Sequence, residues 1–202
     1  MQEQAQDQDD VQHWIGRHLD GDPNAFESIY DLTILKVYKL VYFLIGRKAE
    51  ADDIVQNVYT QLFRFFHTYD RARPFDKWLN GIVVRQVSDY KRKHWKLTRL
   101  LDKAKRFESA EEADFAGTVV DNVANELLLH QINALPLKYK TVLILHYLNG
   151  YTHAEVADLL GIPTGTVKSR LNAGLEKLRK KQAIWNLSPG KDVKDAWILR
   201  TK

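Results

Sequence analysis

The fold of this chain is decided by residues 151–181, YTHAEVADLLGIPTGTVKSRLNAGLEKLRKK, which predict two amphipathic helices joined by a tight turn. Thr152 is expected to cap the first helix, with Glu155 reaching back to the free backbone donors in a capping box. Gly161 supplies the permissive backbone needed just past a helix end. Pro163 suits the start of the next helix, where a missing N–H costs little. The pattern therefore predicts a helix-turn-helix.

The second of these helices is expected to begin near Thr164 and to carry an apolar stripe beside a basic face. Its apolar residues recur at spacings of three and four, so one face packs against the first helix. The polar residues project elsewhere and are candidates for contacts in a DNA major groove. An ordinary helical hairpin with a solvated basic face is the alternative. The stripe comprises Val167, Leu171, Leu175 and Leu178, and the polar candidates are Lys168, Ser169, Arg170 and Asn172.

Length and composition set the class of protein. The 202 residues, 45% of them hydrophobic, are enough to bury one or two compact cores. The net charge is +4, with basic residues concentrated in 85–106 and acidic residues in 1–22 and 107–122, and this uneven distribution favours a polyanionic partner. The sequence has no cysteine, no secretory signal and no apolar run of about 20 residues, which predicts a cytoplasmic protein without direct membrane insertion.

Helical periodicity in the first half predicts a helical domain over residues 11–97, after a mobile N-terminus at 1–10. Pro74 biases the residue before it away from helix, so Tyr69–Pro74 is expected to be a loop. Gly46 closes the longest helical pattern of this half. The expected helices cover Val11–Leu19, Phe26–Ile45, Ala49–His67 and a segment from Asp76 into basic residues.

The second half predicts a smaller helical domain over residues 124–184. Helices are expected at 126–134 and 137–148, packed under the helix-turn-helix. Residues 98–123 are expected to form a flexible acidic linker, and 185–202 a C-terminal extension. Because no strand-like alternation of useful length occurs, the fold class is predicted to be all-α, with two helical domains of which the second contains the helix-turn-helix.

Residues that would support catalysis or bind a metal form no recognisable motif in this sequence. There is no Gly-rich phosphate loop, no His-Glu-x-x-His and no serine flanked by glycines. The seven histidines are scattered along the chain. Asp52 and Asp53 are adjacent on a predicted helix, so they do not face each other as an acid/base pair would. We therefore expect a protein that is not an enzyme and has no cofactor or metal.

Aromatic residues interleaved with cations form a different pattern between residues 69 and 95. Rings stack on bases and cations pair with phosphates, so a polyanion with exposed bases is recognised by both. Stacking contributes roughly 1 to 3 kcal/mol per base, which favours unstacked DNA as the ligand. For Phe75 and Trp78 a place in the hydrophobic core is the alternative. The aromatic residues are Tyr69, Phe75, Trp78, Tyr90 and Trp95, and the cations are Arg71, Arg73, Arg85, Lys91, Arg92 and Lys93.

Four motifs in order resemble the bacterial extracytoplasmic-function sigma factors, which belong to the sigma-seventy family. They are DDIVQNVY at 52–59, FDKWL at 75–79, DYKRK at 89–93 and GTVKSRL at 165–171. The resemblance covers about residues 23–181 and implies a promoter-specificity subunit of RNA polymerase.

The resemblance also implies three contact regions, carried over by position. One helix would dock on the clamp of the largest subunit of core RNA polymerase, through Asp52, Asp53, Gln56 and Asn57. The Tyr69–Pro74 loop would capture a base flipped from the minus-ten element, and the helix after it would run along that element. The implied minus-ten contacts are Tyr69, Arg71, Arg73, Phe75, Trp78, Arg85, Tyr90, Arg92 and Lys93. The implied minus-thirty-five contacts are Thr166, Lys168, Ser169, Arg170 and Asn172.

Two departures from the family pattern fall on DNA-facing positions. Family members commonly carry Asn where this chain has Arg85, and a second arginine-bearing run where it has Asn172-Ala173-Gly174-Leu175. Gly174 disfavours the later half of the recognition helix, because glycine is a poor helix former. The promoter sequence therefore does not transfer from relatives.

The resemblance implies an anti-sigma factor as a further partner, besides core polymerase and promoter DNA. The acidic linker would thread the RNA path of the polymerase, or it is a plain solvated tether. The strongest rival interpretation is a helix-turn-helix transcription regulator that binds duplex DNA without polymerase, although such a protein would not need the 75–79 motif followed by a basic helix. An enzyme acting on RNA or DNA is a second rival, which the lack of paired carboxylates or ligand clusters disfavours.

Overall fold

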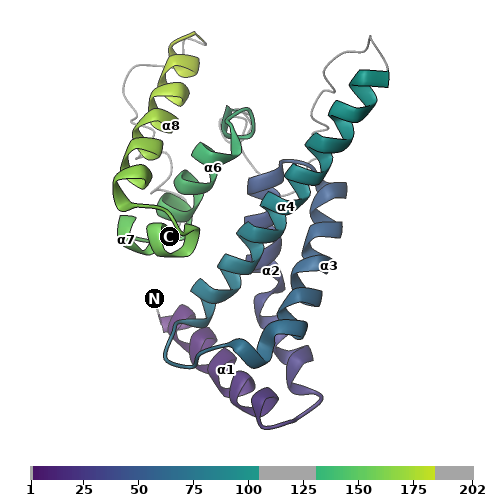
Figure 1. The fold of residues 1–202 in the computed structure, drawn as a ribbon. Coiled ribbons are helices and arrows are strands. Elements are labelled where there is room, and N and C mark those ends of the chain that lie inside the picture. Colours follow the sequence, from purple (N-terminus) through teal and green to yellow (C-terminus); the bar gives the residue numbers. More distant parts are fainter. Residues whose placement is uncertain (1, 105–130, 185–202) are drawn as a thin grey trace. The chain divides into compact units, whose positions relative to one another are not determined.

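The computed structural model describes residues 2–104 and 131–184, and within these ranges the regular elements are helices without any strand (Figure 1). The chain divides into two compact units, Met1–Tyr42 with Arg47–Glu112 and Phe43–Gly46 with Ala113–Lys202. The predicted all-α class with two helical domains is confirmed. Three predicted segments lie outside the described residues: the linker from residue 105 on, most of the helix at 126–134, and the extension at 185–202.

The described part of the N-terminal unit, which ends at residue 104, contains four α-helices and one short 3-10 helix. They are α1 (Gln2–Leu19), α2 (Ala25–Ile45), α3 (Lys48–Phe65), η1 (Phe66–Thr68) and α4 (Phe75–Ala104). Gly21 and Gly46 follow α1 and α2 with φ of +94° and +84°, a left-handed conformation that ends a helix at little cost in glycine.

Two helix bounds differ from the sequence prediction. α1 begins at Gln2 and so includes residues that were expected to precede the first helix, and α4 continues to Ala104, past the expected domain end at 97. Both added segments contain good helix formers and neither glycine nor proline, so nothing in their sequence stops a helix that has already started. The predicted mobility of residues 1–10 stays a prediction.

Apolar stripes from α2, α3 and α4 form the core of this unit. A buried polar link joins α2 to α3: the Thr33 hydroxyl donates to the Ile29 carbonyl at 2.6 Å, and the Tyr59 hydroxyl lies 2.9 Å from the same Thr33 oxygen. Burial raises the pKa of Tyr59, so this phenol stays neutral. The buried core residues include Ile29, Val37, Leu40, Val41, Ile54, Val58, Leu62, Phe75, Leu79, Val83 and Val87.

The described part of the C-terminal unit contains α6 (Leu137–Leu143), η2 (Ile144–Leu148), α7 (His153–Leu160) and α8 (Thr164–Ile184). The single helix expected at 137–148 is therefore an α-helix that widens into a π-helical turn. The capping box is confirmed: Thr152 Oγ accepts from the Glu155 backbone N–H at 3.3 Å, and Glu155 Oε2 accepts from the Thr152 N–H at 2.8 Å. Gly161 has φ of +61° at the end of α7.

α6 and α7 both pack on α8. The predicted stripe of Val167, Leu171, Leu175 and Leu178 is buried. α8 also runs through Gly174 without interruption, which corrects the expectation that this glycine weakens the helix. A Cβ at Gly174 would lie 2.9 Å from Leu143 Cδ1, so the missing side chain lets α6 approach α8 closely. Packing against α6 therefore offsets the low helix propensity of glycine.

Candidate nucleic-acid and partner interfaces

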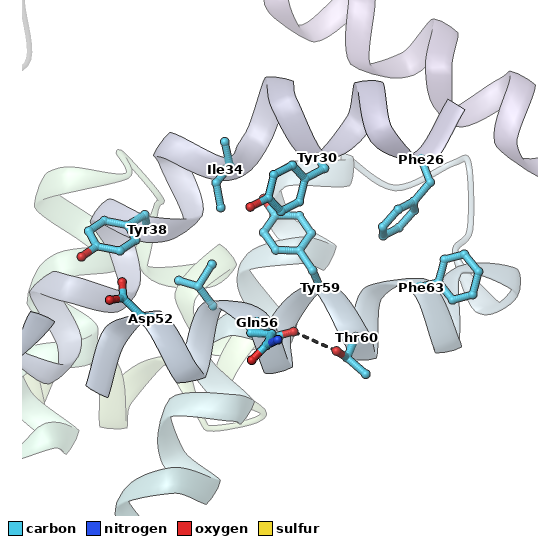
Figure 2. Close-up of a pocket in the computed structure, with 10 residues that line it drawn as sticks. Phe26, Tyr30, Ile34, Tyr38, Asp52, Gln56, Tyr59, Thr60 and Phe63 are labelled. Carbon is cyan, nitrogen blue, oxygen red and sulfur yellow. Dashed lines mark hydrogen bonds between the residues drawn. The ribbon is translucent and has the colours of Figure 1, made fainter. Parts of the chain in front are cut away.

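A groove of about 740 Å³ lies between α2 and α3 (Figure 2). Side chains at helical spacing on both helices line it, and most of them are apolar or aromatic. Tyr30 packs on Tyr59 with ring centroids 4.5 Å apart, and Phe26 meets Phe63 edge-on at 5.1 Å. Phe63 is 62% exposed and Tyr30 39%, so the groove presents rings to solvent. Its lining is Phe26, Tyr30, Ile34, Tyr38, Asp52, Val55, Gln56, Tyr59, Thr60 and Phe63.

The four residues predicted to bind polymerase are all exposed on α3. Asp52 and Gln56 line the groove, whereas Asp53 and Asn57 lie beside it on the same helix. Burial raises the pKa of Tyr38. The Asp52 carboxylate, which accepts a hydrogen bond from the Tyr38 hydroxyl, raises this pKa further. Asn57 Nδ2 donates to the Asp53 carbonyl at 2.8 Å. The polar half of this surface was predicted from the sequence, but its aromatic half was not.

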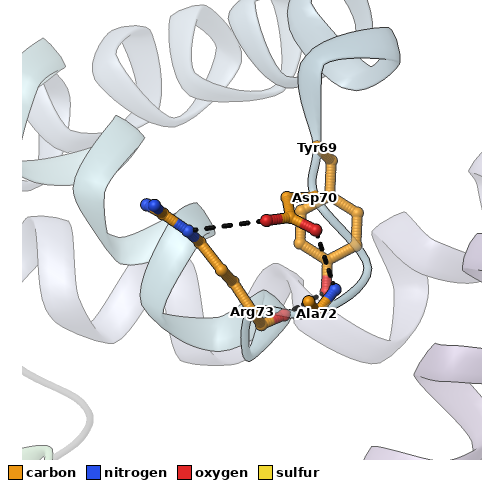
Figure 3. A network of polar contacts seen from close by, with 4 residues as sticks. All are labelled: Tyr69, Asp70, Ala72 and Arg73. Atoms are coloured by element: carbon orange, nitrogen blue, oxygen red, sulfur yellow. Dashed lines mark hydrogen bonds and ion pairs between the residues drawn. The ribbon is translucent and has the colours of Figure 1, made fainter.

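The loop between η1 and α4 is held by its own polar contacts (Figure 3). Asp70 Oδ1 accepts from the Ala72 N–H at 2.9 Å, and the Tyr69 hydroxyl donates to the Arg73 carbonyl at 2.6 Å. Arg73 Nε lies 3.7 Å from Asp70 Oδ2. These contacts fix the backbone of the predicted Tyr69–Pro74 loop while the side chains of Arg71 and Arg73 stay exposed.

Two aromatic residues predicted to contact DNA are buried instead. Tyr69 is 6% exposed and Phe75 is 2% exposed, and their rings meet edge-on at 5.4 Å. Trp78 is half-buried, with its ring centroid 5.0 Å from that of Tyr69. Both rings therefore complete the core beneath the loop in this structure, and their contacts with DNA stay a prediction. Core placement was the alternative that the sequence left open for Phe75.

The exposed face of α4 carries the cations expected there. Arg85, Arg92 and Lys93 are exposed, and Arg92 Nη2 lies 3.0 Å from Asp89 Oδ1. Tyr90 is half-buried and turns toward α3: burial and then the carboxylates of Glu50 and Asp53 raise the pKa of Tyr90, whose hydroxyl donates to Glu50. Among the five aromatic residues of the sequence pattern, Trp95 is the most exposed, at 58%.

The recognition helix α8 presents its predicted polar residues unequally. Lys168, Ser169 and Asn172 are exposed, whereas Thr166 and Arg170 are half-buried. Ser169 Oγ donates to the Thr166 carbonyl at 3.0 Å, so its oxygen remains an acceptor for an outside donor. The predicted polar residues therefore lie in the first turns of the helix, and further exposed charged side chains follow at Glu176, Lys177 and Lys180.

Two histidines, one on η2 and one on α7, meet close to Lys168 of α8. The ring centroids of His146 and His153 are 4.7 Å apart, and His146 Nδ1 lies 2.7 Å from the Tyr151 carbonyl oxygen. Burial, and then the charges of His146 and Lys168, lower the pKa of His153. In residues 2–104 and 131–184, no cluster of three or more histidine, cysteine or acidic side chains is arranged to hold a metal ion.

Two family models match this chain, one on each unit. Sigma-70 region 2 matches residues 29–97, and Sigma-70, region 4 matches residues 125–178. SigW of Bacillus subtilis, an ECF RNA polymerase sigma factor, is 32% identical over 180 residues, which cover 80% of this chain and 90% of that protein. The chain belongs to the ECF RNA polymerase sigma factors. The first family model covers α3 and most of α2 and α4, and the second covers α6, α7 and most of α8.

Two solved structures share the fold. RpoE of Bartonella quintana, crystallised with the anti-sigma factor NepR, matches with a TM-score of 0.63 and 18% identity, over 82% of this chain and 99% of that one. CnrH in complex with the cytosolic domain of CnrY matches with a TM-score of 0.60 and 18% identity, over 86% and 97%. Among the helices that the structure describes in this sigma factor, none has the length and apolar character to cross a membrane.

Proposed function

We propose that this sigma factor binds core RNA polymerase and directs it to promoters by holding DNA in two physical states. The N-terminal unit grips the opened minus-ten element, and the C-terminal unit reads the minus-thirty-five element as duplex. The proposal rests chiefly on one observation, which is that the two units carry different surfaces. The C-terminal unit contains a helix-turn-helix with an exposed polar face. The N-terminal unit contains a loop held by internal hydrogen bonds and a helix with exposed cations. The protein acts in the cytoplasm and contributes no catalysis of its own.

The groove between α2 and α3 is the proposed docking surface for polymerase. Exposed aromatic residues at the centre of a concave surface are typical of the residues that carry most of the energy of a protein interface. Phe63 and Tyr30 have this character, and the exposed Asp52 adds an acidic edge. The groove therefore suits an amphipathic helical element of the polymerase whose apolar side chains alternate with basic ones. Asp53 and Asn57 would extend this contact outside the groove.

The loop and α4 are the proposed minus-ten contacts. The backbone of Tyr69–Pro74 is held in place before DNA binds, so little ordering is needed when a flipped base arrives. Arg85 and Arg92 lie seven residues apart, about 10.5 Å along the helix axis, which corresponds to about three base steps of 3.4 Å. Arg85 is therefore placed to pair with one phosphate of the opened strand, and Arg92 and Lys93 with phosphates about three steps away. Trp78 packs beneath the loop.

The first turns of α8 are the proposed minus-thirty-five contacts. Lys168, Ser169 and Asn172 share one exposed face, and Asn172 offers the amide that pairs with adenine in a major groove. Arg170 and Thr166, which are half-buried, flank this face.

An anti-sigma factor is proposed as a further partner. The similar solved sigma factor RpoE is in complex with the anti-sigma factor NepR, which supports a protein of this class as a regulator of the present chain. An anti-sigma factor bound at the groove would block polymerase binding, and one bound at the DNA-contacting surfaces would block promoter binding.

Binding measurements separate this proposal from the regulator alternative. We expect the purified chain to form a stable complex with bacterial core polymerase and to support initiation at selected promoters. We expect no tight footprint on promoter DNA when polymerase is omitted. A tight footprint without polymerase, together with no complex with core enzyme, would establish the regulator interpretation instead.

A further inference from the structure

α1 precedes the part of the chain that the Sigma-70 region 2 model matches, yet it contacts both candidate interfaces of the N-terminal unit. At the loop, Gln12 forms a side-chain hydrogen bond with Tyr69. Arg71 Nη2 also lies 3.5 Å from Oδ1 of Asp20, the residue that follows α1. At the groove, the ring of His18 packs on the aromatic end. A change in the docking of α1 would therefore reach both interfaces at once.

His18 joins the end of α1 to the other helices, in addition to Val11 and Ile15, whose side chains are buried. Its ring centroid lies 4.5 Å from that of Phe66 on η1, 5.5 Å from that of Phe26 on α2 and 6.1 Å from that of Phe63 on α3. Phe26 and Phe63 line the α2–α3 groove, and Phe66 is 2% exposed in the core. One imidazole thus joins the first helix to the groove and to the core beneath it.

The ring nitrogen Nδ1 of His18 is buried and has no hydrogen-bond partner among the residues that the structure describes. A neutral imidazole can occupy such a position, because its Nδ1 can stay unprotonated while its single N–H is on Nε2. An imidazolium carries an N–H on both nitrogens, so protonation would place an unsatisfied charged donor in this aromatic cluster. The site therefore selects the neutral ring.

The surroundings offer little compensation for a positive charge. From α2, α3 and η1 the groups that face the ring are the phenyl rings of Phe26, Phe63 and Phe66. The charged group that acts on His18 is Asp22 in the turn after α1, which is paired with Arg17 at 2.7 Å. Burial lowers the pKa of His18 from its ordinary value of 6.5, and Asp22 opposes this change as the smaller influence.

We propose that His18 is a pH-sensitive latch, which holds α1 on the groove when neutral and releases α1 when protonated. Because the docked state favours the neutral ring, the undocked state takes up the proton more readily. Docking of α1 is therefore complete above pH 6.5 and weakens as the pH falls below that value. Released α1 would leave the aromatic end of the groove and the Tyr69–Pro74 loop without support. On the basis of the proposed function, acidification then weakens the binding of core polymerase.

Hydrogen exchange on the full chain tests the latch without polymerase. Protection of the α1 backbone amides is measured between about pH 7.5 and 5.5 and corrected for the intrinsic exchange rate at each pH. The undocked ring has the ordinary pKa of 6.5, so at pH 5.5 a site that requires the neutral ring loses at most about tenfold in its equilibrium constant. We therefore expect protection to fall in the wild-type chain, by up to about tenfold. His18→Phe keeps a ring in the cluster, but this ring does not titrate. The variant should therefore show no loss of α1 protection as the pH falls. His67→Phe is the matched control, because His67 is exposed on η1 and should leave the fall unchanged.

The titration of His18 itself, followed by NMR on the wild-type chain, decides the matter even if the Phe variant does not fold. A pKa below 6.5 supports the latch, whereas a pKa at or above that value overturns it. An equal loss of protection in the wild-type chain and in His18→Phe would overturn it as well.

Binding to core polymerase tests the functional consequence. We expect the affinity of the wild-type chain to fall between pH 7.5 and 5.5, by up to about tenfold, and that of His18→Phe to change much less. A complex with equal pH dependence in both proteins would overturn the link between the latch and polymerase. Failure of both proteins to bind at any pH would overturn the proposed function, and the hydrogen-exchange result on α1 would still stand.

Discussion

The two units of this sigma factor use their polar residues in different ways. In the C-terminal unit, one short helix presents the exposed residues Lys168, Ser169 and Asn172 over a buried stripe, and most of this arrangement follows from helical spacing alone. In the N-terminal unit, the proposed contacts come from a loop, a helix and a groove between two helices. A rigid duplex can be read by one helix, whereas an opened strand and a protein partner need surfaces built from several elements.

The groove in the N-terminal unit allows the largest effect to be predicted. Phe63→Ala should weaken the complex with core polymerase by about 2 kcal/mol or more, because Phe63 is an exposed aromatic residue at a concave surface. The affinity is measured by titration of core enzyme with labelled chain. Leu35→Ala is the matched control, since Leu35 is 71% exposed on the same unit but does not line the groove. Equal losses of affinity in both variants would show that the groove is not the polymerase-binding surface.

The recognition helix of the C-terminal unit allows the next prediction. Arg170→Ala should reduce discrimination between cognate and altered minus-thirty-five elements by about 1 to 3 kcal/mol if Arg170 contacts a base edge. Holoenzyme affinities for a panel of single-base variants provide the measurement. Lys180→Ala is the control, because Lys180 is exposed near the other end of α8. An equal loss on every sequence would show that Arg170 contacts phosphate and does not read a base.

The packing of α6 on α8 can be tested with two glycines of the same helix. Gly174→Ala should destabilise the chain by about 1 to 2 kcal/mol, because the new Cβ would lie 2.9 Å from the buried Leu143 side chain. Gly165→Ala has open space around the Cβ and should stabilise the chain by some tenths of a kcal/mol. Thermal unfolding of both variants measures the difference. A stabilising Gly174→Ala would show that α6 yields readily at this contact.

The smallest expected effect concerns the start of α7. Thr152→Ala should lower the free energy of unfolding by about 1 kcal/mol, because the backbone N–H of Glu155 loses its capping acceptor. Thr152→Ser keeps the hydroxyl and should remain close to the wild-type value. Urea unfolding of the two variants makes this comparison, and an unchanged Ala variant would mean that the capping box contributes little to the unit.

Local signals explain why the helix-turn-helix was predictable. The Thr152–Glu155 cap, the glycine turn and the apolar stripe each act within a few residues, and the structure reproduces all of them. The fate of the aromatic residues was harder to predict, because an aromatic side chain beside cations suits both a core and a DNA surface. Tyr69 and Phe75 are buried only because η1 and α4 close over them, which is a tertiary effect.

The groove and the His18 cluster could not be found from the sequence for a related reason. The spacing of four from Phe26 to Tyr38 predicts an apolar face on α2, but not whether α3 covers that face fully. Similarly, nothing near His18 in the sequence indicates that its ring meets Phe63, which lies on another helix. Such sites depend on how helices pack and not on helix formation itself.

The central claim is that the two units hold one promoter in different states, and holoenzyme affinity for designed promoter fragments tests it most directly. The fragments carry both elements as duplex, both as single strand, or a duplex minus-thirty-five element joined to a single-stranded non-template minus-ten element. We predict the tightest binding to the hybrid fragment, with loss of that advantage when the states of the two elements are exchanged. Equal affinity for the hybrid and the exchanged fragment would contradict the account.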